Sequence, residues 1–430
     1  MIARVRQSDL LHHGAIVFGG VVAANAFNYL YYMLVGRVAG VVVYGEVTAL
    51  ASALLVLGAP ANVGQLIVAK LAADLDAAGN RAALRRLADV VTLVTALAGV
   101  LVVLIAVVAR TPIAAFFKLS DAAPVVATAF ALAAFFVTYV QRGILQGAHL
   151  FGQFSASLAL EAIARVALGV SLVVGWGATG ALVGSAVGIV LAAGYNLLVF
   201  RRRFGPERAR VPLDRSTLMR VVTGVGLGQC TLTVLTFYDV PLVKHVFDAR
   251  SAGLYAAAAL VGRAVIAASL FIPTIVLPKA TARVAGGRSA LPLLVGAVGL
   301  AAALVAFAAL CGFVAPRFVV TLVAGRAFGA AAPLVLPYVL ASGALSIATV
   351  IAAYNFGLHQ YAFVPAMFVA ACIEIVTLSL WHPSLQAVVG VLLAGHTLVL
   401  LASLYGTAIP VLHRGANVTG WPARPSSGPG

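Results

Sequence analysis

Ionisable side chains interrupt the long apolar stretches of this chain, and their chemistry gives the first indication of function. Arg263 lies in the middle of the stretch 252–277 without an acidic neighbour in sequence. A planar guanidinium in a low-dielectric cavity could hold a diphosphate through two parallel hydrogen bonds. The alternative is a structural ion pair with another helix, for which Asp239 in the stretch 221–243 is a candidate. Because a charge inside a membrane is costly, it needs either a partner or a function.

Two further carboxylates lie inside apolar stretches. Glu161 and Arg165 are four residues apart in the stretch 155–174, with the glutamate first. This spacing and order favour an ion pair on one helix face, and such a pair can be self-satisfied or can line a cavity. Glu374, in the stretch 363–380, either binds a coupling proton or Na⁺ or is a protonated contact between helices.

Polar residues form two stripes at helical spacing. Asp239 shares a helix face with Thr231 and Thr236. Asn25 and Asn28 form a matching stripe in the stretch 14–35. Facing stripes predict a water-filled cavity between them, and the alternative is hydrogen bonding that holds the helices together.

A third stripe runs out of the stretch 122–140. Its members recur at helical spacing and are Arg142, Gln146, His149 and Gln153. This stripe is either an entry site for sugar or phosphate or a solvated interfacial face. The remaining histidines of the chain are expected to be satisfied locally.

The composition identifies the environment of these residues. Of 430 residues, 63% are hydrophobic and 9% are charged, and the mean hydropathy is +1.08. Soluble domains carry about 25% charged residues, so this is an all-α polytopic membrane protein. Its net charge of +16 is expected in cytoplasmic loops near anionic lipid, and no nucleic-acid partner is expected. The three cysteines lie in apolar stretches and give no disulfide or metal spacing.

The apolar stretches predict about twelve transmembrane helices, because a spanning helix needs about 20 mostly apolar residues. The predicted halves are 1–205 and 206–414, followed by a disordered cytoplasmic tail at 415–430. The predicted spans are 14–35, 47–68, 90–109, 122–140, 155–174, 180–200, 221–243, 252–277, 291–314, 330–356, 363–380 and 387–411.

The distribution of positive charge predicts the orientation. With the N-terminus in the cytoplasm, 19 of the 28 lysines and arginines fall in inner segments and 7 in outer segments. Seven of the inner ones lie in the central loop Arg201–Arg220. The positive-inside rule therefore places both termini in the cytoplasm of a plasma (inner) membrane protein. Brief loops and the lack of a phosphate-binding G-x-x-x-x-G-K-[ST] motif indicate that the chain is not an enzyme.

The two halves show signs of an internal repeat. With an offset of 211 residues, Tyr44 falls on Tyr255 and Asn28 falls on Asp239. An even number of spans per half makes such repeats parallel, and repeats of this kind place a substrate site at their interface.

Three motifs resemble one known family. Leu34–Gly45 (LVGRVAGVVVYG), Phe237–Tyr255 (FYDVPLVKHVFDARSAGLY) and Arg142–Gly147 (RGILQG) are similar to segments of polysaccharide-export flippases. That family belongs to a superfamily that also holds multidrug and toxic compound extrusion carriers and the lipid II flippase. The resemblance implies two six-helix bundles around a central cavity, alternating access, and outward movement of lipid-diphosphate-linked oligosaccharides.

The leading hypothesis is therefore a flippase for lipid-linked oligosaccharides. Its substrate-binding residues would be Arg263, Arg142, Arg165 and Asn28. Its ion-coupling or cavity-lining residues would be Asp239, Glu161 and Glu374. We expect no cofactor other than a coupling proton or sodium ion, a monomer, and glycosyltransferases of the same pathway and membrane lipids as partners. The alternatives are a proton- or sodium-coupled drug or metabolite antiporter of the same superfamily, and a membrane glycosyltransferase or assembly scaffold.

Overall fold

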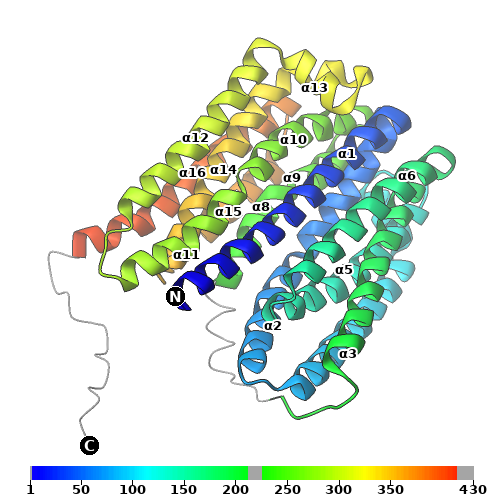
Figure 1. Cartoon of the computed structure of the whole chain (residues 1–430). Coiled ribbons are helices and arrows are strands. Elements are labelled where there is room, and N and C mark those ends of the chain that lie inside the picture. Colours follow the sequence, from blue (N-terminus) through cyan, green and yellow to red (C-terminus); the bar gives the residue numbers. More distant parts are fainter. Residues whose placement is uncertain (1, 212–224, 414–430) are drawn as a thin grey trace, which may run out of the picture.

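Two groups of helices make up the protein. The computed structural model describes residues 2–211 and 225–413, and these ranges contain helices and turns but no β-strand. Figure 1 shows the two groups side by side. The first holds α1 (Ile2–Leu57), α2 (Ala59–Ala77), α3 (Arg81–Val108), α4 (Arg110–Phe116), α5 (Ala123–Gly147) and α6 (Phe151–Phe204). The second holds α8 (Leu227–Phe237), α9 (Asp239–Val246), α10 (Ala249–Ser269), α11 (Phe271–Ala285), α12 (Leu291–Val314), α13 (Pro316–Ala324), η2 (Arg326–Ala331), α14 (Ala332–Gly357), α15 (Phe363–Leu380) and α16 (Leu385–His413).

Helices α1 and α6 are too long to cross a membrane only once. They contain 56 and 54 residues, which would extend about 80 Å if straight, against a hydrocarbon core of about 30 Å. Each contains a glycine with non-helical dihedrals, Gly40 at φ 75° and Gly177 at φ 54°. In α6 the chain folds back, since a Cβ on Gly184 would lie 2.3 Å from the backbone nitrogen of Gly169. Each helix is therefore a hairpin that turns at a glycine, which tolerates positive φ.

The number of crossings agrees with the sequence prediction. Nine helical stretches of the described residues are long and apolar enough to span a membrane. Helices α1 and α6 each make two crossings, and α8 with α9 makes one more, interrupted at Tyr238. This confirms the predicted all-α fold of about twelve transmembrane helices. The connection predicted at 36–46 shrinks to the turn at Gly40, because the residues on both sides of it are helical.

The backbone repeats along the chain as the 211-residue offset predicts. The break between α1 and α2 at Gly58 corresponds to the break between α10 and α11 at Leu270. After α5 and α14 the chain turns through a histidine with positive φ, His149 at 55° and His359 at 56°. The first group of helices ends at Phe204, next to the boundary predicted between 205 and 206. The limits of the halves stay a prediction, and the predicted tail 415–430 lies outside the described residues, as does most of the latter half of Arg201–Arg220.

The two ends of the molecule differ in charge. Gly40 and Gly177 turn at one end, which we call the hairpin end. The opposite end, which we call the basic end, carries the exposed side chains of Lys70, Arg86 and Arg283. Figure 1 shows α13 at the hairpin end and the start of α1 toward the basic end.

The apolar cores show how the two groups of helices are joined. The largest core includes residues of both groups, among them Tyr44 and Phe328, whose rings meet edge to face with centroids 5.1 Å apart. At the basic end each group has its own core, around Leu84 and Phe200 in the first and around Ile272 in the second. The groups are therefore packed together at the hairpin end and have separate cores at the basic end.

Candidate functional site

A buried ion pair of the second group of helices is hydrogen-bonded to the first group. Nη2 of Arg263 on α10 donates to Oδ1 of Asp239 on α9 at 2.8 Å, and Asp239 is 1% exposed. The hydroxyls of Tyr255 on α10 and Tyr338 on α14 both donate to Oδ2. Nη1 of Arg263 donates to the Ser52 hydroxyl of α1 at 3.0 Å. We call these five residues the Asp239 cluster, and it links the second group to the first.

The cluster bears directly on the predicted role of Arg263. The structural ion pair considered as the alternative to phosphate binding is formed, and both terminal nitrogens of Arg263 have partners inside the protein. Only its Nε is buried without a partner. A diphosphate would therefore have to replace Asp239 or Ser52 to reach the terminal nitrogens. Substrate binding by Arg263 stays a prediction.

A second charged network lies within the first group of helices. Glu161 on α6 accepts from Arg142 of α5 at 2.8 Å and from Arg165 of α6 at 2.6 Å. The i, i+4 pair predicted from the sequence is thus formed. Arg142 also donates to Ser157, and Arg165 donates to Oδ1 of Asn28 on α1 at 2.7 Å. We call this the Glu161 cluster, and with two guanidinium groups on one carboxylate it carries a net positive charge.

The structure places the predicted site residues in separate networks. Arg142, Arg165 and Asn28 have their partners in the first group of helices, whereas Arg263 shares none of those partners. Asn28 and Asp239 correspond under the repeat, yet each contacts an arginine on a helix that the repeat does not match. A joint action of the three arginines on one substrate stays a prediction.

The predicted polar stripe from Arg142 is not continuous. Helix α5 ends at Gly147, and His149 adopts positive φ, so the stripe is broken before Gln153. Gln146 accepts from Gln65 at 2.7 Å, and His149 lies 3.2 Å from Asp76. The prediction of one helical stripe was wrong, because helical spacing in the sequence does not reveal the left-handed turn that ends the helix.

Glu374 is the third buried carboxylate of the predicted set. Oε1 accepts from the Tyr238 hydroxyl at 2.8 Å and lies 3.4 Å from Nε2 of His396 on α16. Its other oxygen, Oε2, has no hydrogen-bond partner. The expectation that the remaining histidines are satisfied locally is wrong for His396, since its Nε2 has no hydrogen bond either.

Polar contacts also cross between the two groups at the hairpin end. Lys244 of α9 is fully buried, and its Nζ lies 3.9 Å from Oε1 of Glu46 on α1. Three further donors reach backbone carbonyls of the other group. These are Arg37 to Leu322 at 2.6 Å, Lys118 to Val246 at 2.8 Å and His245 to Phe116 at 2.8 Å. Together with the shared apolar core, they close the hairpin end.

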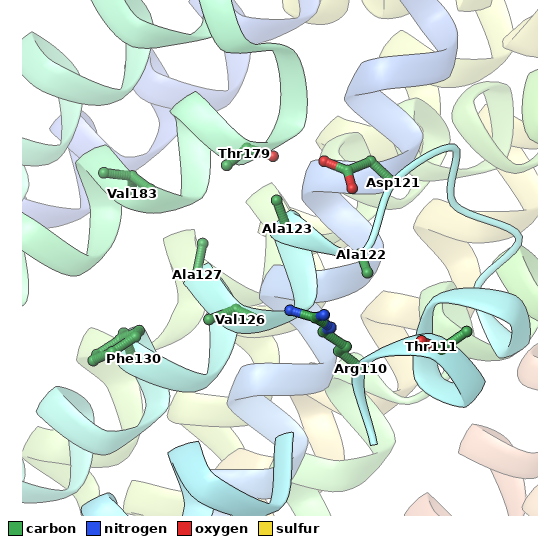
Figure 2. A pocket seen from close by; sticks show the side chains of 10 residues that line it. All are labelled: Arg110, Thr111, Asp121, Ala122, Ala123, Val126, Ala127, Phe130, Thr179 and Val183. Carbon is green, nitrogen blue, oxygen red and sulfur yellow. The ribbon is translucent and has the colours of Figure 1, made fainter. Parts of the chain in front are cut away.

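A pocket of about 700 Å³ lies away from both charged clusters. Figure 2 shows it between the start of α4, the start of α5 and the part of α6 that follows Gly177. Its charged lining residues are Arg110 and Asp121, and Phe130 contributes an exposed ring. It lies at the hairpin end, and its lining includes none of the predicted site residues.

Sequence reasoning missed several residues of these networks. Tyr255, Tyr338 and His396 lie in apolar stretches, where an aromatic ring is usually read as core packing. Lys244 and Glu46 fall near predicted span ends, where charged residues are expected in solvent. The one signal available in the sequence was that the charged residues of the spans have no counter-charges next to them, so their partners had to come from other helices. Among the described residues, no group of three or more His, Cys, Asp or Glu side chains could hold a metal ion.

Comparison with known proteins identifies the fold. No protein-family model and no curated protein matches the sequence. An inward-facing multidrug resistance MATE family transporter of the MOP superfamily matches with a TM-score of 0.67 at 13% identity, over 92% of this chain and 96% of that one. An outward-facing structure of such a transporter gives 0.57 at 14% identity, over 94% and 96%. A eukaryotic MATE transporter gives 0.62 at 15% identity, over 96% and 97%.

The chain is therefore a membrane-embedded protein with the fold of MATE transporters, built from two helical bundles. The fold expected for this superfamily is confirmed. Membership of the polysaccharide-export family within it stays a prediction.

Proposed function

We propose that the protein is a secondary transporter that works by alternating access and exchanges an organic solute for a cation. The observation that carries this proposal is the MATE fold over more than nine-tenths of the chain, joined at one end only. The shared core and the crossing contacts hold the hairpin end shut, whereas each bundle has its own core at the basic end. A rocking of one bundle against the other would close one end as it opens the other.

The orientation follows from charge. We infer that the basic end faces the cytoplasm, because short cytoplasmic loops collect lysine and arginine. The structure would then represent an inward-facing state, in keeping with the higher TM-score to the inward-facing neighbour than to the outward-facing one, 0.67 against 0.57.

Labelling of single cysteines tests this orientation. In a background without Cys230, Cys311 and Cys372, Arg110→Cys at the hairpin end should react with a membrane-impermeant maleimide in intact cells. Lys70→Cys at the basic end should react only after the cells are opened. The reverse pattern would place the basic end outside.

The charges around Asp239 and Glu374, apart from the Lys244–Glu46 pair at the hairpin end, favour exchange of a cation over binding of a diphosphate. The buried network there holds the carboxylates Asp239 and Glu374 but a single arginine, Arg263, and Arg263 is already paired. An acidic excess attracts a coupling cation or a cationic solute, and it repels a diphosphate. The drug or metabolite antiporter, rather than the flippase, is therefore our leading functional proposal.

The flippase for lipid-linked oligosaccharides is the second candidate, because the first bundle has the opposite charge. In the Glu161 cluster two arginines share one carboxylate, and the side chain of Arg165 is 17% exposed. Both terminal nitrogens of Arg165 already donate, to Glu161 and to Asn28, so a phosphate would have to replace one of these partners, as at Arg263. The excess positive charge of the cluster is what favours a phosphate there.

Proteoliposomes separate the two candidates. Ethidium, a cationic dye, and a lipid-diphosphate-linked sugar are offered in parallel, with a pH gradient, with a sodium gradient and with neither. Antiport predicts dye accumulation that depends on one gradient and is absent from protein-free vesicles. Movement of the lipid-linked sugar without dye transport would favour the flippase and overturn the antiporter.

A further inference from the structure

The Glu374–His396 pair lies in the core of the second bundle, between α15 and α16. Both residues are buried, with exposed fractions of 2% and 5%. A Cβ on Gly395 would lie 2.2 Å from Oε2 of Glu374, so the absence of a side chain at this position is what lets the carboxylate lie against α16. Oε2 of Glu374 and Nε2 of His396 are both buried without a hydrogen-bond partner. Two unsatisfied polar atoms in one apolar core call for an explanation.

The hydrogen bonding of His396 determines which of its nitrogens carries a proton. Nδ1 lies 2.9 Å from the backbone carbonyl oxygen of Ala341 on α14. A carbonyl oxygen only accepts, so we assign an N–H to Nδ1. A neutral imidazole has a single N–H, and Nε2 then presents a lone pair to Oε1 of Glu374 at 3.4 Å. Two acceptors that face each other in a buried site repel unless one of them is protonated.

We propose that the Glu374–His396 pair binds one proton and is the coupling-ion site of the transporter. The proton completes the contact whether it resides on Nε2 or on the carboxylate, because either arrangement places a donor opposite an acceptor. This inference rests on the proposed antiport function for its role in transport, although the binding of the proton itself does not.

The surroundings favour a proton over a sodium ion. Within the described part of the chain, the Tyr238 hydroxyl donates to Oε1 of Glu374 at 2.8 Å, and the backbone carbonyls of Ala341 and Leu235 lie beside the imidazole of His396. Hard cations select several oxygen ligands, whereas an imidazole nitrogen suits softer metals. Asp239 of α9 also lies near the pair, but its carboxylate is already engaged by Arg263 and by Tyr338 of α14.

A short path of hydrogen bonds and one peptide link connects the pair to the contact between the bundles. Tyr238 stands at the break between α8 and α9, directly before Asp239. Asp239 holds Arg263, and Arg263 donates to Ser52 of the other bundle. A change at Glu374 that shifts the Tyr238 hydroxyl would therefore move the break between α8 and α9. Asp239, which holds Arg263 against Ser52 of the other bundle, would move with it. In this way proton binding could bias the equilibrium between the two states.

Nuclear magnetic resonance on the purified full-length protein tests proton binding without any substrate. The histidine rings carry ¹⁵N and the glutamate carboxyl groups carry ¹³C, and the signals are assigned with His396→Gln and Glu374→Gln. Between about pH 5 and pH 9 one group of the pair should take up a proton. Loss of either partner should move the midpoint of the other by about one pH unit or more, a tenfold change in proton affinity. His359→Gln, at an exposed histidine, is the matched control and should move neither midpoint.

The outcomes decide between three assignments. If neither group titrates, or if each titrates independently of the other, the shared-proton site is wrong. If replacing KCl by NaCl at constant pH displaces the proton, the site binds sodium and the proton assignment is overturned. Because Glu374→Gln keeps the side-chain volume and an acceptor for Tyr238, it keeps the experiment decisive even if His396→Gln does not fold.

Ethidium transport then tests the role of the pair separately. In proteoliposomes with the parental protein, a pH gradient should increase dye accumulation at least tenfold, and with Glu374→Gln the gradient should no longer increase it. His359→Gln should retain the parental gradient dependence. If the parental protein moves no dye, the antiport proposal fails while the magnetic resonance result still decides proton binding. If Glu374→Gln responds to the gradient as the parent does, the coupling role is wrong.

Discussion

The buried pair of Glu46 and Lys244 at the hairpin end allows a quantitative prediction for the free energy of unfolding. Lys244 is fully buried, makes no hydrogen bond, and has its Nζ 3.9 Å from Oε1 of Glu46. At that distance and an effective dielectric constant of about 20, the attraction is about 4 kcal/mol. Removing one partner of a buried pair costs about 3–5 kcal/mol, because the other charge is left uncompensated. Glu46→Gln should therefore lower the free energy of unfolding by about 3–4 kcal/mol.

The double variant distinguishes a lost charge partner from damaged packing. Lys244→Met replaces the ammonium with an apolar side chain of similar length, and on its own it leaves Glu46 unpaired. When Glu46→Gln and Lys244→Met are combined, no uncompensated charge remains, and the protein should recover to within about 1 kcal/mol of the parent. The measurement is unfolding in mixed detergent micelles, followed by circular dichroism, for the parent and all three variants.

An exposed pair provides the control. Lys70 and Asp74 are an i, i+4 pair at 3.3 Å whose side chains are 42% and 64% exposed. Lys70→Met or Asp74→Asn should change the free energy of unfolding by less than about 0.5 kcal/mol. The reasoning is refuted if Glu46→Gln is as mild as these controls, or if the effects of Glu46→Gln and Lys244→Met simply add.

Two smaller changes test local geometry. Gly395→Ala should lower the unfolding free energy by about 1–3 kcal/mol through the clash with Glu374, whereas Gly390→Ala, with open space around it, should stabilise the helix slightly. Unfolding of both variants in micelles measures the contrast, and equal effects would contradict the close approach of Gly395 to Glu374. Asp248 caps α10, and hydrogen bonds from Ser251 lower its pKa below the usual 3.8, so its contribution of about 1 kcal/mol is present above that pH and is lost as the pH falls through the folded-state pKa. Asp248→Ala should therefore be less stable than the parent at pH 7, with a gap that narrows toward pH 3; a gap independent of pH would exclude the carboxylate cap.

The fold could be predicted from the sequence because the bilayer imposes a length on every crossing. Twelve apolar stretches were visible, and the described residues form nine helical stretches apolar enough to span, of which α1 and α6 each turn back at a glycine. What the pattern could not show is how the crossings are joined. The turns at Gly40 and Gly177 each depend on a single residue with positive φ, and flanking residues remain helical right up to it. The helical connections next to these turns cannot be told from the apolar stretches by composition, so hydropathy underestimates the lengths of such helices.

The candidate sites were predictable only in part, and for a physical reason. An in-membrane charge demands a partner, and for Glu161 the partner lies one helical turn away, where spacing reveals it. Asp239 finds Arg263 across 24 positions, and Tyr338 across 99. Such contacts are decided by which helices pack together, and a tyrosine in an apolar stretch gives no sign that its hydroxyl serves a carboxylate.

The contacts that close the hairpin end are of a kind that a transporter can break. Three of them run from a charged or polar side chain to a backbone carbonyl, from Arg37, Lys118 and His245. When that end opens, water can take over both the donor and the carbonyl, so each bond is worth only about 0.5–3 kcal/mol net. Lys244 would regain hydration in the same motion, which offsets part of its lost attraction to Glu46. Under the proposed alternating access, closure by such contacts would keep the two states within a few kcal/mol of each other, and only then could a single bound proton or solute shift the population from one to the other.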